Sequence, residues 1–198
     1  MPRTKEQFKS IREKTRAQIL NTALELFAQK GFKGTTISDI AKAARISKGL
    51  AYNYFSSKQN LMIAVLNLLT IEIEQLFSAI QNISDPFEQL RVIIELTFIN
   101  LEKDEKFWRL YVSFLLQPDV KEDAEAITNG LLNEGFKLFE NIFKQIGFKN
   151  PKNEAKLLGA IIDGMSFHYI FNKEYYPLKR MKRFLQKKYN KESLEKLK

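Results

Sequence analysis

The feature that most constrains the fold is a series of three helix starts within 23 residues, Thr36 to Lys58, which read TISDIAKAARISKGLAYNYFSSK. The first helix is marked by an apolar stripe at i, i+3, i+4 and i+7, formed by Ile37, Ile40, Ala41 and Ala44. Thr36 is a natural N-cap, and Asp39 stands where a capping box places its second acceptor. We therefore expect a short helix that begins close to Thr36 and ends near Ala44.

A second helix follows after a tight turn, because Ser47 is a new N-cap residue directly after Arg45-Ile46. Between Ser47 and Phe55 only Ala51 and Phe55 share an inward face. The outward positions are Lys48, Gly49, Leu50, Tyr52, Asn53 and Tyr54. A projecting helix that carries a cation, an amide and two phenols can contact phosphates and the edges of bases. This pattern predicts a surface that reads DNA.

A third start is expected at Ser56, with Gln59 spaced as the partner of a capping box and Lys58 in the first turn. The N-terminus of a helix with a lysine beside it suits a backbone phosphate. We expect Thr36, Ser47 and Lys58 to contact phosphates and so to set the position of the second helix on DNA.

Residues 16 to 66 resemble the DNA-binding domain of the tetracycline-repressor (TetR) family of bacterial transcription regulators. The resemblance rests on ILNTALELFAQKGFKGTTISDIAKAA, ISKGLAYNYF and SSKQNLMIAVL. It implies a helix-turn-helix DNA-binding domain with a basic N-terminal arm over residues 1–57, and a helical ligand-binding and dimerisation domain over residues 58–198. It also implies a homodimer that binds a palindromic operator and is released by a small-molecule effector, most often as a repressor, with an activator of the same fold as the alternative.

Two positions depart from the family pattern. Arg45 stands where the family usually has glycine, so we expect a residue with a Cβ at positive φ, at a cost of roughly 1 kcal/mol. Leu50-Ala51 replaces a small polar residue followed by a large apolar one. Our hypothesis is that Leu50 contacts the methyl group of a thymine.

The net charge of +9 is unevenly distributed along the chain. Residues 1–58 hold 12 Lys/Arg against 4 Asp/Glu, residues 59–172 hold 10 against 16, and residues 173–198 hold 10 against 3. The cationic first part suits salt-sensitive binding to double-stranded DNA. The basic arm at residues 3–16 is either disordered until it meets DNA or a frayed terminus, and the basic C-terminal part is either a solvated helix face or a second contact with nucleic acid or membrane.

The remaining chain predicts an all-α fold, because no stretch shows sustained period-two alternation. Helices are expected near residues 15–30, from Lys58 through Phe77 without a break, and at 86–102, 104–117, 120–146, 151–172 and 177–192, with breaks at Gly31, Pro118, Gly147 and Pro177. The absence of cysteines and of long apolar runs fits a cytoplasmic bacterial protein with no membrane contact.

The helix after Asn150-Pro151 is apolar around most of its circumference, with Gly159 and Gly164 interspersed. Such a helix must be covered on all sides. Either one side packs on a second subunit, or the whole helix is buried in one monomer. The resemblance implies the first, with the dimer interface on this helix and on a neighbouring one.

The second half of the chain is rich in aromatic residues, most of which must be core. In a domain that resembles a ligand sensor, some are expected to line an apolar cavity of roughly 300 to 1,000 Å³. The candidates for an apolar or aromatic effector are Phe98, Trp108, Tyr111, Phe114 and Phe167, with Arg109, Asp163 and His168 as polar groups. The alternatives are a surface ion pair for Arg109, an interface hydrogen bond for Asp163 and an interior position for His168.

An enzyme is not expected, and neither catalytic residues, a metal site nor a cofactor is predicted. His168 is the single histidine, and the sequence has neither a phosphate-binding glycine loop nor an HExxH pair. A nucleic-acid-binding protein without sequence preference is a further alternative, since basic termini would serve it too.

Overall fold

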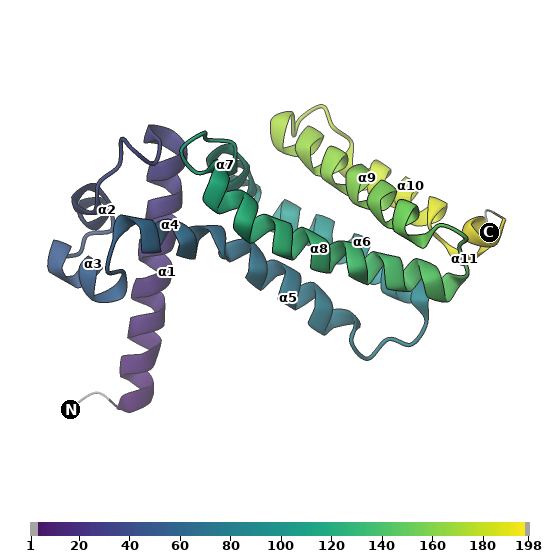
Figure 1. Ribbon diagram of the computed structural model, residues 1–198, viewed down its shortest axis with the longest axis horizontal. Coiled ribbons are helices and arrows are strands. Elements are labelled where there is room, and N and C mark those ends of the chain that lie inside the picture. Colours follow the sequence, from purple (N-terminus) through teal and green to yellow (C-terminus); the bar gives the residue numbers. More distant parts are fainter. Residues whose placement is uncertain (1–3, 197–198) are drawn as a thin grey trace. The chain divides into compact units, whose positions relative to one another are not determined.

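The computed structural model describes residues 4–196, apart from the side chains at positions 69, 72, 73, 121, 123, 124, 127, 128, 131 and 132. Every regular element in this described part is a helix, so the predicted all-α fold class is confirmed (Figure 1). None of the described helices has the length and apolar character needed to cross a bilayer. The chain divides into an N-terminal unit, Met1–Leu68 with Leu110–Ile127, and a C-terminal unit, Leu69–Arg109 with Thr128–Lys198.

The N-terminal unit is built on α1 (Lys5–Lys30), α2 (Ile37–Ala43), α3 (Lys48–Tyr54) and α4 (Lys58–Leu66). Its core is formed by apolar side chains spaced three or four residues apart on each helix, including Ile19, Ala23, Phe27, Ile40, Leu61, Met62 and Val65. Gly31 ends α1 as predicted, with φ 80° and its N–H donating to the Phe27 carbonyl.

The start of α1 differs from the prediction. We expected the helix near Thr15, whereas it begins at Lys5, with Thr4 and Gln7 forming a capping box. Lys, Glu, Gln and Arg are good helix formers, and the capping box supplies the N-terminal hydrogen bonds. The basic arm is therefore helical from Lys5 onward, and its first residue, Arg3, lies outside the described residues.

The long helix predicted from Lys58 through Phe77 is wrong as a single element. Helix α4 ends at Leu66 with Asn67 as its C-cap, and α5 (Leu68–Ile80) follows. The buried hydroxyl of Tyr111 donates to the Leu66 carbonyl at 2.7 Å, so the end of α4 is bound by a distant residue. The predicted N-cap also moves by one residue, because Ser57 and not Ser56 accepts from the backbone at Asn60.

The segment Leu110–Ile127, which includes the end of α7 (Glu105–Leu115), packs on the C-terminal end of α1. The Phe114 ring stacks on that of Phe27 at 5.3 Å. Gln117 donates to the Phe27 carbonyl at 2.6 Å and accepts from the Phe32 N–H at 3.1 Å. One amide side chain thus satisfies two backbone groups where α1 ends.

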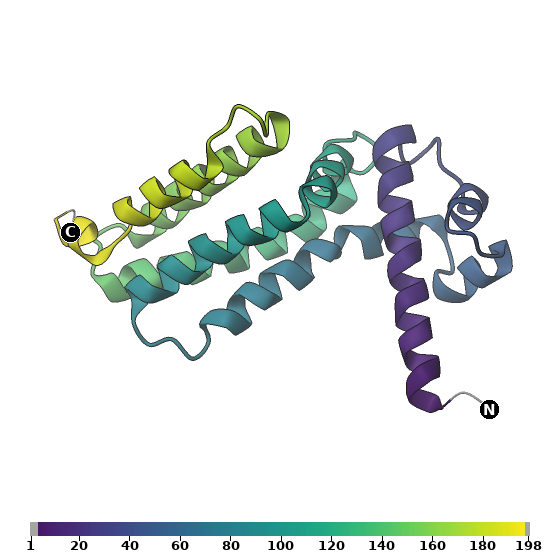
Figure 2. The same cartoon turned by 180° about the vertical axis from the view of Figure 1, so that it is seen from behind.

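The C-terminal unit contains α5, α6 (Pro86–Lys103), α9 (Pro151–Phe171), α10 (Leu178–Lys188) and α11 (Lys191–Glu195), with most of α8 (Lys121–Ile146). The predicted helices 86–102, 104–117, 120–146 and 151–172 are present within two residues at their ends. The one predicted at 177–192 is too long, since Asn190 caps a separate α11. Helices α9 and α10 run side by side in opposite directions (Figure 2).

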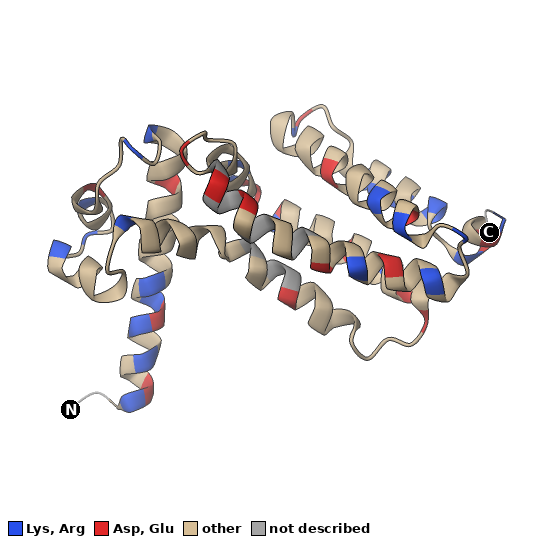
Figure 3. Cartoon of the chain, in the orientation of Figure 1, with Lys and Arg blue, Asp and Glu red and all other residues tan. Residues whose placement is uncertain are grey.

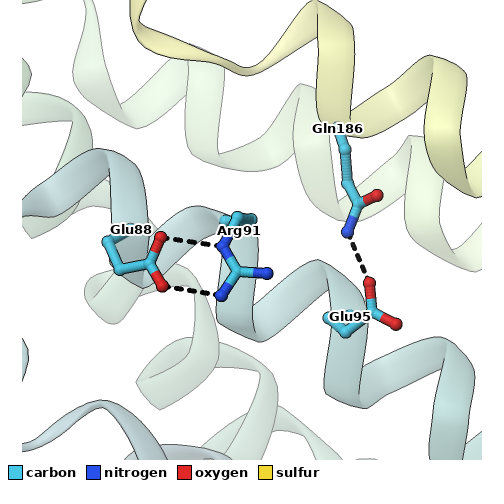
Figure 4. Close-up of polar contacts among 4 residues, drawn as sticks. All are labelled: Glu88, Arg91, Glu95 and Gln186. Carbon is cyan, nitrogen blue, oxygen red and sulfur yellow. Dashed lines mark hydrogen bonds and ion pairs between the residues drawn. The ribbon is translucent and has the colours of Figure 1, made fainter.

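Packing in this unit joins α9 to α8 and α10 to α6. A Cβ at Gly159 would lie 2.6 Å from the Phe136 ring, so this glycine lets α8 approach α9 within the chain. The Glu95 carboxylate of α6 accepts from Lys182 at 2.7 Å and from Gln186 at 2.6 Å, both on α10. Figure 4 shows the contact with Gln186. These contacts, that of Lys182 first, lower the pKa of Glu95 below its ordinary value of 4.5.

Candidate nucleic-acid interface

The predicted capping box at the start of α2 is confirmed. The Thr36 hydroxyl accepts from the Asp39 N–H at 3.1 Å, and the Asp39 carboxylate accepts from the Thr36 N–H at 2.9 Å and from its hydroxyl at 2.6 Å. The hydrogen bonds from Thr36 lower the pKa of Asp39. The shorter aspartate therefore closes the box as a glutamate would, and α2 begins at a defined residue.

The turn between α2 and α3 carries the predicted strain. Arg45 has a φ of 54°, a left-handed conformation that residues other than glycine rarely adopt. The neighbouring backbone is held by the Gln18 side chain, which donates to the Ala44 carbonyl at 2.8 Å, and by Ile46, which donates to the Ala41 carbonyl at 3.0 Å. These bonds hold the turn that directs α3 away from α2.

Helix α3 presents the face that its sequence pattern predicts. Ser47 caps it by accepting from the Leu50 N–H at 3.1 Å, while Ala51 and Phe55 are buried. The exposed set is Lys48, Gly49, Leu50 (37% exposed), Tyr52 (45% exposed) and Asn53. Tyr54 differs from these, because it is half-buried and lies 5.9 Å from the Arg12 guanidinium.

The packing of the protein does not require a glycine at position 49. A Cβ at this position would meet no atom of the described residues within 4 Å. The missing side chain instead leaves the backbone of α3 open to close approach from outside.

Lys58 is held by its own chain. Its ammonium donates to the Phe32 carbonyl at 2.8 Å and to the Thr35 carbonyl at 3.0 Å, and it lies 4.3 Å from the centre of the Phe32 ring. Two of its three N–H donors thus fasten the loop after α1. Lys58 therefore has a structural role, and its contact with a phosphate stays a prediction from the sequence.

From the sequence Arg12 and Arg16 belong only to the basic arm, but the structure places them against α3 and its C-cap. The Arg16 guanidinium lies 5.5 Å from the ring of Phe55, the residue that ends α3. Their spacing at i and i+4 on one helix is the sequence signal that pairs them, although it does not reveal their neighbours.

The predicted ligand residues are divided between the two units. Phe98 is buried in the core of the C-terminal unit, and Trp108 packs against that core. Arg109 makes an ion pair with Glu105 at 3.1 Å, the alternative considered for it. Tyr111 and Phe114 belong to the N-terminal unit, where they bind Leu66 and Phe27.

The other three predicted ligand residues lie on α9. Phe167 is 53% exposed and its ring lies 6.2 Å from that of His168. His168 is exposed and stacks on Tyr176 at 5.6 Å, so it is not an interior histidine. Asp163 is exposed to solvent, yet the surrounding protein removes part of the hydration of its carboxylate and so raises its pKa.

Comparisons with known proteins agree with this geometry. Residues 19–65 match the family described as bacterial regulatory proteins, tetR family. The HTH-type transcriptional regulator YuxN of Bacillus subtilis is 44% identical over 159 residues, which are 77% of this chain and 52% of YuxN. The chain spans between about half and two thirds of the length of the first curated relatives it matches.

Solved structures show the same fold. The regulator FadR of Bacillus subtilis, in complex with stearoyl-CoA, has a TM-score of 0.70 at 21% identity, over 87% of this chain and 96% of FadR. A regulator from Saccharomonospora viridis in complex with choline has a TM-score of 0.64 at 23% identity, over 89% and 95% of the two chains. Together with the capped α2, the strained turn and the exposed α3, the family match over residues 19–65 and the identity with YuxN place the chain in the tetR family of bacterial regulatory proteins.

Proposed function

We propose that the protein is a ligand-responsive transcriptional regulator that binds a palindromic DNA operator as a homodimer. Release from DNA by a small-molecule effector makes it a repressor, and an activator of the same fold is the alternative. Residues 1–57 would bind DNA, and residues 58–198 would bind the effector and the second subunit. The observation that carries the proposal is the exposed face of α3. The helix is fixed by its N-cap Ser47 and the buried Ala51, while most of its outward side chains stay exposed.

In this proposal α3 enters the major groove of DNA. Asn53 and Tyr52 would make hydrogen bonds to the edges of bases, and Leu50 would contact a thymine methyl group. Lys48 would bind a phosphate, and Gly49 would allow the backbone to come close. The N-termini of α2 and α4, at Thr36 and Lys58, would bind phosphates that fix the orientation.

A homodimer is supported by the outer face of α9. One side of this helix packs into the C-terminal unit, while an opposite stripe stays exposed within the chain, formed by Leu157, Ala160, Phe167 and Phe171, with open space at Gly164. A contiguous apolar stripe of this kind favours a partner, and a two-fold axis would bring the same stripe from both subunits together. Two copies of α3 would then read half-sites whose centres are about one helical turn, or a multiple of it, apart.

The effector is proposed to be apolar or aromatic. FadR carries stearoyl-CoA and the Saccharomonospora regulator carries choline, so this fold accepts ligands of different chemistry. Binding would detach the dimer from DNA only if the effector has different affinities for the two states, with a coupling of about 1–3 kcal/mol.

The proposal is tested by selecting duplexes from a random-sequence pool with the full-length chain. We expect an inverted repeat to be enriched and to bind at least about 10³-fold more tightly than unrelated duplexes. Tyr52→Ala should weaken that binding, whereas Tyr175→Ala, at a tyrosine that is 81% exposed in the C-terminal unit, should not. Enrichment of no sequence would reject the proposal in favour of a binder without sequence preference.

A further inference from the structure

The first three turns of α1 carry a stripe of cations that lies outside the surface described so far. Lys5, Lys9, Arg12 and Arg16 are spaced at i, i+4, i+7 and i+11, so they share one face of the helix. All four side chains are exposed, and Figure 3 shows Lys and Arg concentrated over these turns. Within residues 4–196, no carboxylate pairs with any of the four.

The rest of α1 shows on which side of this helix the cationic stripe lies. The same face continues through Ile19, Ala23 and Phe27, which are fully buried in the N-terminal unit. The face is therefore apolar where α1 packs on its neighbours and cationic where it extends beyond them, past α3 (Figure 1). Because Arg12 and Arg16 contact Tyr54 and Phe55, the cationic stripe is on the side of α1 next to α3.

We propose that the cationic stripe is a second DNA-binding element, which follows the phosphate backbone beside the half-site contacted by α3. This inference rests on the proposed function. Four cations at roughly 5.5 Å intervals extend over about 17 Å, which equals the rise of about five base pairs. A duplex held by α3 would lie next to this line of charge, so DNA is the polyanion that the stripe fits.

The cationic stripe and α3 are expected to contribute differently to DNA binding. Phosphate contacts add affinity and salt dependence without choosing a sequence, whereas α3 chooses the sequence. Since the stripe is already helical and positioned by the α1 core, binding would not have to order it first.

The test compares two charge removals on the same helix in the full-length chain. Lys9→Gln removes a cation from the stripe, and Lys14→Gln removes one from the opposite face of α1. Gln has nearly the helix propensity of Lys, and circular dichroism checks that both variants stay folded. The dissociation constant is measured by fluorescence anisotropy at salt concentrations of about 50 to 200 mM, with the selected duplex and with an unrelated one.

Since the proposed homodimer carries each substitution twice, we expect the slope of log K against log salt to fall by about 1.8 for Lys9→Gln and by about 3.6 for Lys5→Gln with Lys9→Gln. For the double variant, the factor by which affinity falls over that salt range should shrink about 100-fold. Lys14→Gln should keep the wild-type slope, and Lys9→Arg should restore it. In hydroxyl-radical footprints, the double variant should lose protection at the flank of each half-site.

An unchanged slope in the double variant would overturn the inference, and so would an equal decrease in Lys14→Gln. These outcomes are separate from failure of the proposed function. If the wild-type chain shows no sequence preference, the slopes on the unrelated duplex still decide whether the stripe binds phosphates.

Discussion

At the scale of single residues, Gly49 separates what the fold needs from what the proposed function needs. It lies inside α3, exposed, with no atom of the described chain near the position of a Cβ. Gly49→Ala should therefore stabilise the protein by up to about 1 kcal/mol, because alanine loses less backbone entropy in a helix. The same methyl group would stand between α3 and the floor of the major groove.

We accordingly expect Gly49→Ala to raise the melting temperature and to weaken operator binding. Thermal unfolding and anisotropy titrations on the same preparation measure both effects. Lys42→Ala, at an exposed position on α2, is a control for which neither change is expected to be large. Tight operator binding by a stabilised Gly49→Ala protein would show that the backbone of α3 does not approach DNA closely.

How far single residues could be predicted depends on where their partners lie in the sequence. The inward and outward positions of α3 follow from helical spacing, and the structure agrees with them at Ala51, Leu50 and Tyr52. The positive φ of Arg45 was predictable from the resemblance, because Arg45 stands where the family usually has glycine. The contacts of Lys58 were not, because its two carbonyl partners lie 26 and 23 residues earlier in the chain.

At the scale of elements, helices with local start and stop residues could be predicted, and helices ended by tertiary contacts could not. Asp85 with Pro86 starts α6, and Gly147 follows α8, as the sequence indicates. The break at Asn67 falls in a continuous apolar pattern, and the residue that binds there, Tyr111, is 45 residues from its partner. From a periodic pattern, the existence of a helix can be predicted more securely than the residue at which it ends.

The contact between α6 and α10 leads to a prediction about pH. Glu95→Gln should cost about 1–2 kcal/mol of folding free energy at pH 7, because the carboxylate accepts two hydrogen bonds, one of them from a cation. The pKa of Glu95 is lower in the folded protein than its ordinary value of 4.5. Its contribution is therefore complete above that value and is lost as the pH falls through the folded pKa.

Urea unfolding at pH 7 and at successively lower pH values measures this effect. The free-energy difference between the wild type and Glu95→Gln should shrink as the pH drops below 4.5. Glu88→Gln is the matched control on the same helix, since Glu88 binds Arg91 one turn away at the surface (Figure 4). That local pair should contribute less than about 1 kcal/mol. A pH-independent difference at Glu95 would contradict the role given to its charge.

At the scale of the whole molecule, the proposed binding to a palindromic operator requires two copies of the chain. One chain offers a single α3, whereas a palindrome has two half-sites. The exposed stripe on α9 offers an apolar surface of the C-terminal unit to the second copy. Dimerisation and operator affinity should therefore change together when that stripe is altered.

Phe167→Glu should weaken the dimer at least about 30-fold, because each change introduces two charges into a two-fold interface and a central aromatic residue contributes about 2 kcal/mol or more. Ile99→Glu is the control, since Ile99 is 42% exposed on α6 and belongs neither to α9 nor to the adjacent α10. Sedimentation velocity over a concentration series measures the dimer, and anisotropy with full and half operators measures the consequence. The wild type and Ile99→Glu should bind the full operator far more tightly than a half-site, whereas Phe167→Glu should bind both alike. A Phe167→Glu protein that remains dimeric would move the subunit contact away from α9, and a wild type that binds the full operator as a monomer would reject the two-fold arrangement altogether.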